Sequence, residues 1–86
     1  MKIRAYENFR KKYKSLPLHI QVKVDKQISI LSKDFHHPSL HTKKIKGSKN
    51  IWEARIDLQY RMTFEIIENT IYLRVIGNHD EVLNNP

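Results

Sequence analysis

The sequence predicts an α+β fold in which two N-terminal helices pack on one face of a small antiparallel β-sheet. Apolar residues recur with a helical period before residue 34, and they alternate with polar residues after residue 50. Only short connections separate the alternating segments, which favours hairpins between antiparallel strands. The 86 residues contain no repeat and no low-complexity linker, so we expect a single domain over residues 1–86.

A short strand and a helix are expected at the start of the chain. Residues 2–6 alternate weakly between charged and apolar side chains, which indicates a short strand. Asn8 is then a suitable N-cap, because its side chain can accept a hydrogen bond from the first helical turn. We expect the helix to end near Ser15, since Pro17 disfavours a helical conformation in the residue before it. The apolar face of this helix consists of Phe9, Tyr13 and Leu16.

The segment that follows has a mixed pattern. Residues 18–24 alternate strictly between apolar and polar side chains, as a strand would. The longer stretch has apolar residues at helical spacings of 4, 4 and 3, namely Ile20, Val24, Ile28 and Leu31. Pro17 also suits the first turn of a helix. The pattern therefore favours a helix over residues 17–33, with a strand as the open alternative.

Three strands are predicted over residues 51–57, 60–67 and 71–76. In the last of them, the core-facing residues are expected to be Ile71, Leu73 and Val75, and the outward-facing residues Tyr72, Arg74 and Ile76. If the pleats are in phase, the face that the helices leave uncovered carries Arg55, Arg61 and Arg74. We expect Gly77-Asn78-His79-Asp80 to close the last strand, with His79 at the rim of this face.

Lysine and arginine are concentrated in the first part of the chain. Residues 1–50 hold 13 Lys and Arg against 3 Asp and Glu, whereas residues 51–86 hold 3 against 6. Such asymmetry indicates a polyanion such as nucleic acid, or an acidic protein, as partner, although a solvated lysine-rich surface has the same composition. A basic run just before the predicted sheet is suited to following a nucleic-acid backbone. It consists of Lys43, Lys44, Lys46 and Lys49.

Several classes of protein are disfavoured. The chain has no cysteine, which excludes disulfides and thiolate metal ligands and fits a cytoplasmic protein. Neither a signal peptide nor a membrane-spanning segment is recognisable, so we expect no membrane association. The histidines match no zinc-binding spacing, and we expect neither a metal nor another cofactor.

The outward-facing cations suit chemistry at a phosphate. Arginine offers a planar fork for phosphate oxygens, and a nearby histidine can transfer protons near neutral pH. A ribonuclease that uses the RNA 2′-OH as nucleophile needs a base, an acid and cationic stabilisation. His79 can serve as the acid, Arg61 with Arg55 as stabilisers, and Glu53 or a lysine as the base. Ion pairing of these arginines with Glu53 and Glu65 is an equally good account of the pattern.

Several strings in order resemble the RelE/ParE superfamily of toxins from bacterial toxin–antitoxin systems. The resemblance covers nearly the whole chain and lies in the combined order and spacing of the strings. They are residues 9–16 before Pro17, residues 34–40, residues 43–47, Ile51-Trp52-Glu53-Ala54-Arg55, Tyr60-Arg61-Met62-Thr63-Phe64 and Ile76-Gly77-Asn78-His79-Asp80-Glu81-Val82. The resemblance implies two N-terminal helices on a small antiparallel sheet, and it favours the helix over residues 17–33.

The resemblance also implies a type II toxin that is neutralised by a cognate antitoxin, in a complex that often represses its own operon. RelE-like members cleave mRNA on the ribosome without metal, so the implied partners are ribosome, mRNA and antitoxin, with operator DNA bound only through the complex. ParE-like members instead inhibit DNA gyrase. A non-nuclease toxin of that kind and a degenerate toxin that only binds antitoxin are the alternatives.

Individual positions match functional positions of the RelE-like branch. Arg61 matches a cation used at the scissile phosphate, His79 matches the general acid, and Arg55 matches a basic position on the preceding strand. The segment implied to contact RNA or the ribosome includes Lys44 and Lys46, and we add Lys43, Lys49 and Arg74 as further contacts. Two positions depart from the family pattern: Leu83 stands where many members have tyrosine, and Glu53 stands where some have lysine.

Overall fold

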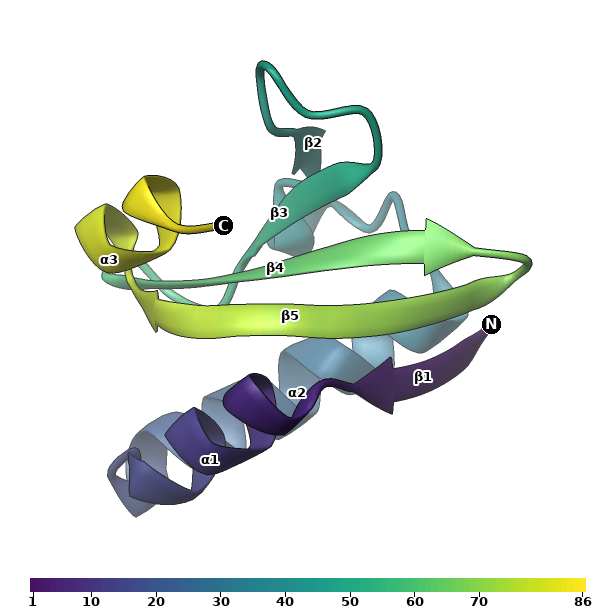
Figure 1. Cartoon of the computed structure of the whole chain (residues 1–86). Helices are drawn as coiled ribbons and strands as arrows, with labels where there is room; N and C mark the ends of the chain where they lie inside the picture. The colour runs from purple at the N-terminus through teal and green to yellow at the C-terminus, as the bar shows by residue number, and fades with distance from the viewer.

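Five strands form one sheet in the order β1-β5-β4-β3-β2 (Figure 1). The computed structural model describes the whole chain, residues 1–86. The strands are β1 (Lys2–Ala5), β2 (Lys43–Lys44), β3 (Ile51–Arg55), β4 (Tyr60–Ile67) and β5 (Thr70–Asn78). All neighbouring strands are antiparallel except β1, which pairs with β5 in parallel. The predicted fold class is confirmed, and the parallel edge strand makes the sheet a mixed one.

The helices precede and follow the main strands. They are α1 (Glu7–Ser15), α2 (Leu18–Lys33), the short 3-10 helix η1 (Pro38–Leu40) and α3 (His79–Asn84). The helical interpretation of residues 17–33 is confirmed. The prediction that Asn8 caps the first helix is wrong, because Tyr6 is the N-cap and Asn8 lies inside the first turn. The Tyr6 N–H donates to Leu73 O at 3.0 Å, so the chain passes from strand pairing directly into the helix.

Helices α1 and α2 lie on one side of the sheet and bury its apolar face (Figure 1). Val24, Leu31 and Phe64 are almost fully buried in the resulting core. At about 25 cal/mol for each Å² of apolar surface removed from water, such packing is the main stabilising term for a chain of this size. None of the helices is both long and apolar enough to cross a membrane.

A β-bulge interrupts the pairing of β4 with β5. Thr63 is opposite Val75 and Phe64 is opposite Leu73, which leaves Arg74 as an extra residue in β5. Because side chains alternate along a strand, one extra residue reverses the faces beyond it. Ile76 is therefore buried in the core, and Val75 faces outward. The predicted assignment of these last two residues was wrong for this reason.

A helix that the pattern did not predict begins at His79. Asn78 Oδ1 accepts from Glu81 N at 2.9 Å, and Glu81 Oε1 accepts from Asn78 N at 3.4 Å, which together form a capping box. Val82 is fully buried where α3 packs on β4 and β5, on the side opposite α1 and α2 (Figure 1). The strand thus ends at Asn78, within the predicted residues 77–80, but His79 starts a helix that was not predicted.

Candidate functional site

A polar cleft of about 420 Å³ opens on the outer face of the sheet. It lies where β3 and β4 meet the start of α3 and the segment leading into β2. No apolar side chain lines it. The lining residues are His41, Thr42, Lys43, Glu53, Arg55, Arg61 and His79. The cleft thus brings together all four predicted catalytic residues and one of the predicted RNA-binding lysines, with three permanent cations against one carboxylate.

Arg61, near the start of β4, is held in a fixed orientation. Its Nε lies 3.5 Å from Glu53 Oε1, and its Nη1 donates to Tyr60 O at 3.1 Å and to Asp57 O. The residue is only 8% exposed. Ion pairing of the predicted kind is therefore present, and it positions the guanidinium at the wall of the cleft. A preorganised cation of this kind costs no reorganisation when charge develops on a ligand.

Arg55 and Arg61 are directly opposite each other on β3 and β4. Like charges in opposite register destabilise a sheet, so this pair is unfavourable unless an anion lies between or near them. Arg55 Nε and Glu53 Oε2 are buried without a hydrogen-bond partner in the chain. Buried polar atoms without partners cost about 1–3 kcal/mol each. The two opposed guanidinium groups, with the Arg55 Nε donor free of any partner in the chain, could therefore bind an anion.

The turn between β3 and β4 holds Arg61 through the backbone carbonyl of Asp57. Asp57 Oδ1 accepts from Gln59 N at 2.9 Å and from Tyr60 N at 2.7 Å, and Lys23 Nζ lies 3.2 Å from Asp57 Oδ2. Burial acts to raise the pKa of Asp57, but these hydrogen bonds and the Lys23 charge outweigh it. The pKa of Asp57 therefore lies below its usual value. The turn that presents its carbonyl to Arg61 depends on the ionised carboxylate.

Two histidines reach the cleft from different parts of the chain. The backbone N–H of His79 donates to Gln59 O at 2.9 Å, and this bond joins the start of α3 to the β3–β4 turn. Its ring is half exposed, and Nδ1 lies 3.6 Å from Asp80 Oδ1. His41 follows η1 with a positive φ of 46°, just before the edge strand β2. Both histidines line the same cleft as the opposed arginines.

The remaining predicted contacts are distributed over a wider surface. Lys44 and Lys46 join Lys43 and Glu53 in a neighbouring hollow, which Leu83 of α3 also lines. Lys44 Nζ lies 5.7 Å from the centroid of the Trp52 ring. Lys49 lies in the exposed loop between β2 and β3 and lines neither this hollow nor the cleft.

Arg74 lies apart from the cleft. Its Nη1 is 3.3 Å from Glu65 Oε1, its Nε donates to Pro86 O at 3.2 Å, and its Cζ is 6.0 Å from the centre of the Tyr6 ring. The three arginines lie on the same outer face of the sheet, but only Arg55 and Arg61 line the cleft, whereas Arg74 lies near the bulge.

Two of the lining residues, His41 and Thr42, were not predicted for the site. No local pattern marks them, since they lie in an irregular segment and reach the cleft only through the pairing of β2 with β3. The start of α3 did have a signal, because Asn78 and Glu81 have the spacing of a capping box. No three His, Asp or Glu side chains gather as a metal-binding group.

Solved structures of toxins share this fold. A chain of the RelB–RelE antitoxin–toxin complex from Methanococcus jannaschii has a TM-score of 0.77 and 25% identity, over 96% of this chain and 99% of that one. A copper-bound mutant toxin from Helicobacter pylori has a TM-score of 0.79 and 21% identity, over 95% of this chain and 98% of that one. YafQ from E. coli has a TM-score of 0.79 and 12% identity, over 94% of this chain and 96% of that one. No protein-family model and no curated protein matches the chain by sequence.

The chain thus has the fold of RelE-type toxins. The resemblance seen in the sequence is thereby confirmed over nearly the whole chain. In this RelE/ParE fold, the cleft lies on the face of the sheet that α1 and α2 leave open. The chemical roles of Arg61, His79, Arg55 and Glu53 stay predictions.

Proposed function

We propose that the chain, as one domain over residues 1–86, is the toxin of a type II toxin–antitoxin system that cleaves mRNA on the ribosome without a metal ion. The observation that carries the proposal is the opposition of Arg55 and Arg61 in a polar cleft that two histidines, His41 and His79, also line. Two opposed guanidinium groups suit the non-bridging oxygens of one phosphate. Two histidines at the same cleft suit proton transfer at the attacking and leaving oxygens.

The proposed reaction is attack of a ribose 2′-OH on the adjacent phosphorus. The 2′-oxygen forms a bond to phosphorus and gives its proton to a base, while the bond from phosphorus to the 5′-oxygen breaks. His79 protonates the departing 5′-oxygen, so the products are a 2′,3′-cyclic phosphate and a 5′-hydroxyl. Arg61 and Arg55 stabilise the additional negative charge of the phosphorane, a contribution of about 10²–10³ in rate for one well-placed donor.

Two side chains are candidates for the base. Glu53 has its Oε1 engaged with Arg61, while Oε2 has no partner in the chain. His41 lines the cleft together with His79 and is exposed. We assign Glu53 mainly to orienting Arg61 and His41 to accepting the 2′-OH proton. The assignment predicts that His41→Ala lowers the rate more at neutral pH than Glu53→Gln does, and the reverse order would return the role of base to Glu53.

The proposed partners follow from charge and from the related structures. The basic segment containing Lys43, Lys44, Lys46 and Lys49 contacts RNA of the ribosome or the message, and such contacts weaken steeply with salt. A cognate antitoxin is proposed as the neutralising partner, because a related chain was solved in an antitoxin–toxin complex. Operator DNA is then bound only through that complex. All of these partners are cytoplasmic.

Inhibition of DNA gyrase, as in ParE-like toxins, is the alternative function. A protein that only binds another protein has no need for proton-transfer groups around opposed cations. The two histidines of the cleft therefore favour the nuclease. The alternative predicts growth arrest with intact mRNA, and the same experiment distinguishes the two functions.

The test is induced expression followed by primer extension on translated mRNA. Wild type should produce new cuts, and His79→Ala and Arg61→Ala should abolish them. Matched controls are His19→Ala and Arg10→Ala, because both residues are exposed on the helices and line no part of the cleft. Intact mRNA with blocked gyrase would refute the nuclease, and a loss of cutting in the controls would refute the specific role of the cleft.

A further inference from the structure

A second polar groove lies between α1, β5 and α3. Two adjoining hollows of about 540 and 380 Å³ share Asn8, Arg74 and Val75 and form this groove. We call it the α1–α3 groove and define it by Tyr6, Asn8, Lys12, Arg74, Asn84 and Asn85. It is distinct from the cleft, since no residue lines both.

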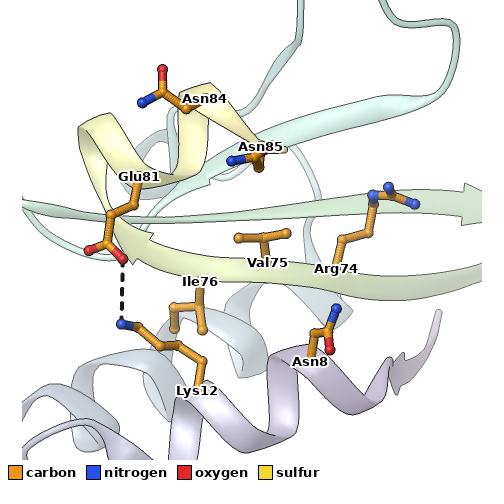
Figure 2. A pocket seen from close by; sticks show the side chains of 8 residues that line it. All are labelled: Asn8, Lys12, Arg74, Val75, Ile76, Glu81, Asn84 and Asn85. Atoms are coloured by element: carbon orange, nitrogen blue, oxygen red, sulfur yellow. Dashed lines mark hydrogen bonds and ion pairs between the residues drawn. The ribbon is translucent and has the colours of Figure 1, made fainter.

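The groove combines three kinds of side chain that can bind single-stranded RNA. Figure 2 shows Asn8 on α1 and the pair Asn84 and Asn85 at the end of α3, on either side of β5. All three carboxamides are exposed, and a carboxamide can donate and accept at the edge of a base. Tyr6 is 41% exposed at one end, where an aromatic ring can contact a base.

The cations of the groove are positioned for a phosphate. Arg74 uses Nε and Nη1 in its bonds to Pro86 O and Glu65, so that Nη2 keeps free donors. Lys12 lies 3.5 Å from Glu81 at the other end, and this pair is visible in Figure 2. Both side chains are partly exposed, so an RNA phosphate can compete for them.

The β-bulge turns the side chains of Arg74 and Val75 toward the groove. Arg74 is the extra residue, and Val75 faces outward as a half-buried apolar floor instead of entering the core. Bulges commonly re-aim side chains next to functional sites. A regular strand would have placed Val75 in the core, with Ile76 outward in its place. The bulge thus presents one cation and one apolar contact side by side.

We propose that the α1–α3 groove binds a nucleotide of single-stranded RNA outside the cleft. The proposal rests on the proposed function in that its ligand is RNA, and it places the predicted RNA contact of Arg74 in this groove. The apolar floor and Tyr6 contact the base, the three carboxamides hydrogen-bond its edge, and Arg74 with Lys12 contacts phosphate. The basic charge of the chain suits RNA and an acidic peptide equally. The three carboxamides favour RNA, because they can hydrogen-bond the edge of a nucleobase.

The test uses a short 2′-O-methyl RNA, which cannot be cleaved through the 2′-oxygen, and measures affinity by fluorescence anisotropy. Asn84→Ala/Asn85→Ala should weaken binding roughly tenfold, from the loss of two to three hydrogen bonds. Lys12→Ala should also weaken binding, whereas Lys11→Ala, an exposed neighbour on the same helix, should change it less than twofold. Equal affinities for wild type, the double variant and Lys12→Ala would overturn the proposal.

Side-chain amide signals in NMR locate the RNA. Those of Asn8, Asn84 and Asn85 should shift during the titration, and their constancy would overturn the proposal even if the variants bind weakly. Shifts caused by a poly-glutamate peptide but not by the RNA would also overturn it. Because the probe is uncleavable, these results are independent of the mRNA cleavage assay, and either hypothesis can fail alone.

Discussion

Two arginine–glutamate pairs lie on the outer face of the sheet, and they differ in their surroundings. Arg61 and Glu53 have side chains that are 10% and 6% exposed, whereas those of Arg74 and Glu65 are 32% and 16% exposed. The first pair has a second arginine opposite it and two histidines beside it. The second has two tyrosines beside it, Tyr6 at the start of α1 and Tyr72 on β5, and the centroids of their stacked rings are 5.7 Å apart.

The difference shows that an ion pair does not by itself exclude a functional role. Around Arg61, the positive charges of Arg55 and Lys43 are left without a carboxylate of their own, and the cleft is suited to a phosphate that reacts. Around Arg74, Glu65 accepts from both the arginine and the Tyr6 hydroxyl, so charge is more nearly balanced. That surface is suited to binding without chemistry.

The largest expected effect is on the free energy of unfolding when each arginine is removed. Arg61→Ala leaves the buried Glu53 carboxylate without its partner and should cost about 3 kcal/mol. Arg74→Ala should cost about 1 kcal/mol, because its pair is more exposed to water. Urea unfolding measures both values. Adding Glu53→Gln to Arg61→Ala should recover part of the loss, and equal losses for the two single variants would break the comparison.

A smaller effect is expected at α3, which contributes residues to both the cleft and the α1–α3 groove. Asn78→Ala removes the N-cap and should destabilise the protein by about 1 kcal/mol. Amide hydrogen exchange should accelerate in residues 79–84 and remain slow in β4. Asn50→Ala is the matched control, since Asn50 is exposed in a loop. Unchanged exchange in α3 would show that the buried Val82, not the cap, holds this helix.

The turn that holds Arg61 should be more sensitive to acid than the surroundings of Arg74. The pKa of Asp57 is lower in the folded protein than its ordinary value near 3.8, so the ionised carboxylate stabilises the fold above that value. This contribution is lost as the pH falls through the folded pKa. Asp57→Asn should therefore lose less stability than wild type when the pH is lowered below about 4. Asp80→Asn, at a fully exposed position, should follow wild type, and identical curves for all three would contradict the prediction.

The smallest expected effect concerns the Arg74 pair at high pH. A hydrogen bond to Glu65, with burial and the Glu65 charge adding to it, raises the pKa of Tyr6 above 10.0. The contribution of this bond is present below that value and is lost as the pH rises through the folded pKa. Glu65→Gln should lower the pKa of Tyr6 in an absorbance titration. The pKa of Tyr13, which a hydrogen bond to Asp25 raises, is the internal control and should not move.

Much of the fold was predictable because periodicity records which face of an element is buried. The spacing of Ile20, Val24 and Leu31 predicted α2, and all three are buried in the core. The turn between β4 and β5 was also predicted, and Glu68 and Asn69 adopt the positive φ values of 47° and 66° that a two-residue hairpin turn requires. Periodicity failed at Arg74, because a bulge leaves no trace in the alternation of residue types before it.

The candidate site was predictable in its residue types but not in its grouping. Alternation alone placed Arg55 and Arg61 on the outer face, and the family resemblance selected Arg61 and His79. Neither indicated that Arg55 would be directly opposite Arg61, since register depends on the length of the β3–β4 turn. His41 was missed because a residue in an irregular segment is placed only by long-range strand pairing.

The sequence by itself determined the two long helices, the three main strands with their buried faces up to the bulge, and the cations of the open face, because these depend on local periodicity and residue chemistry. The tertiary structure decided which of the cations share a site. Strand register put Arg55 opposite Arg61, the pairing of β2 with β3 brought His41 to the same cleft, and the bulge separated Arg74 from both. The reason is physical: local patterns fix the direction of a side chain, whereas its neighbours come from contacts between residues far apart in the chain.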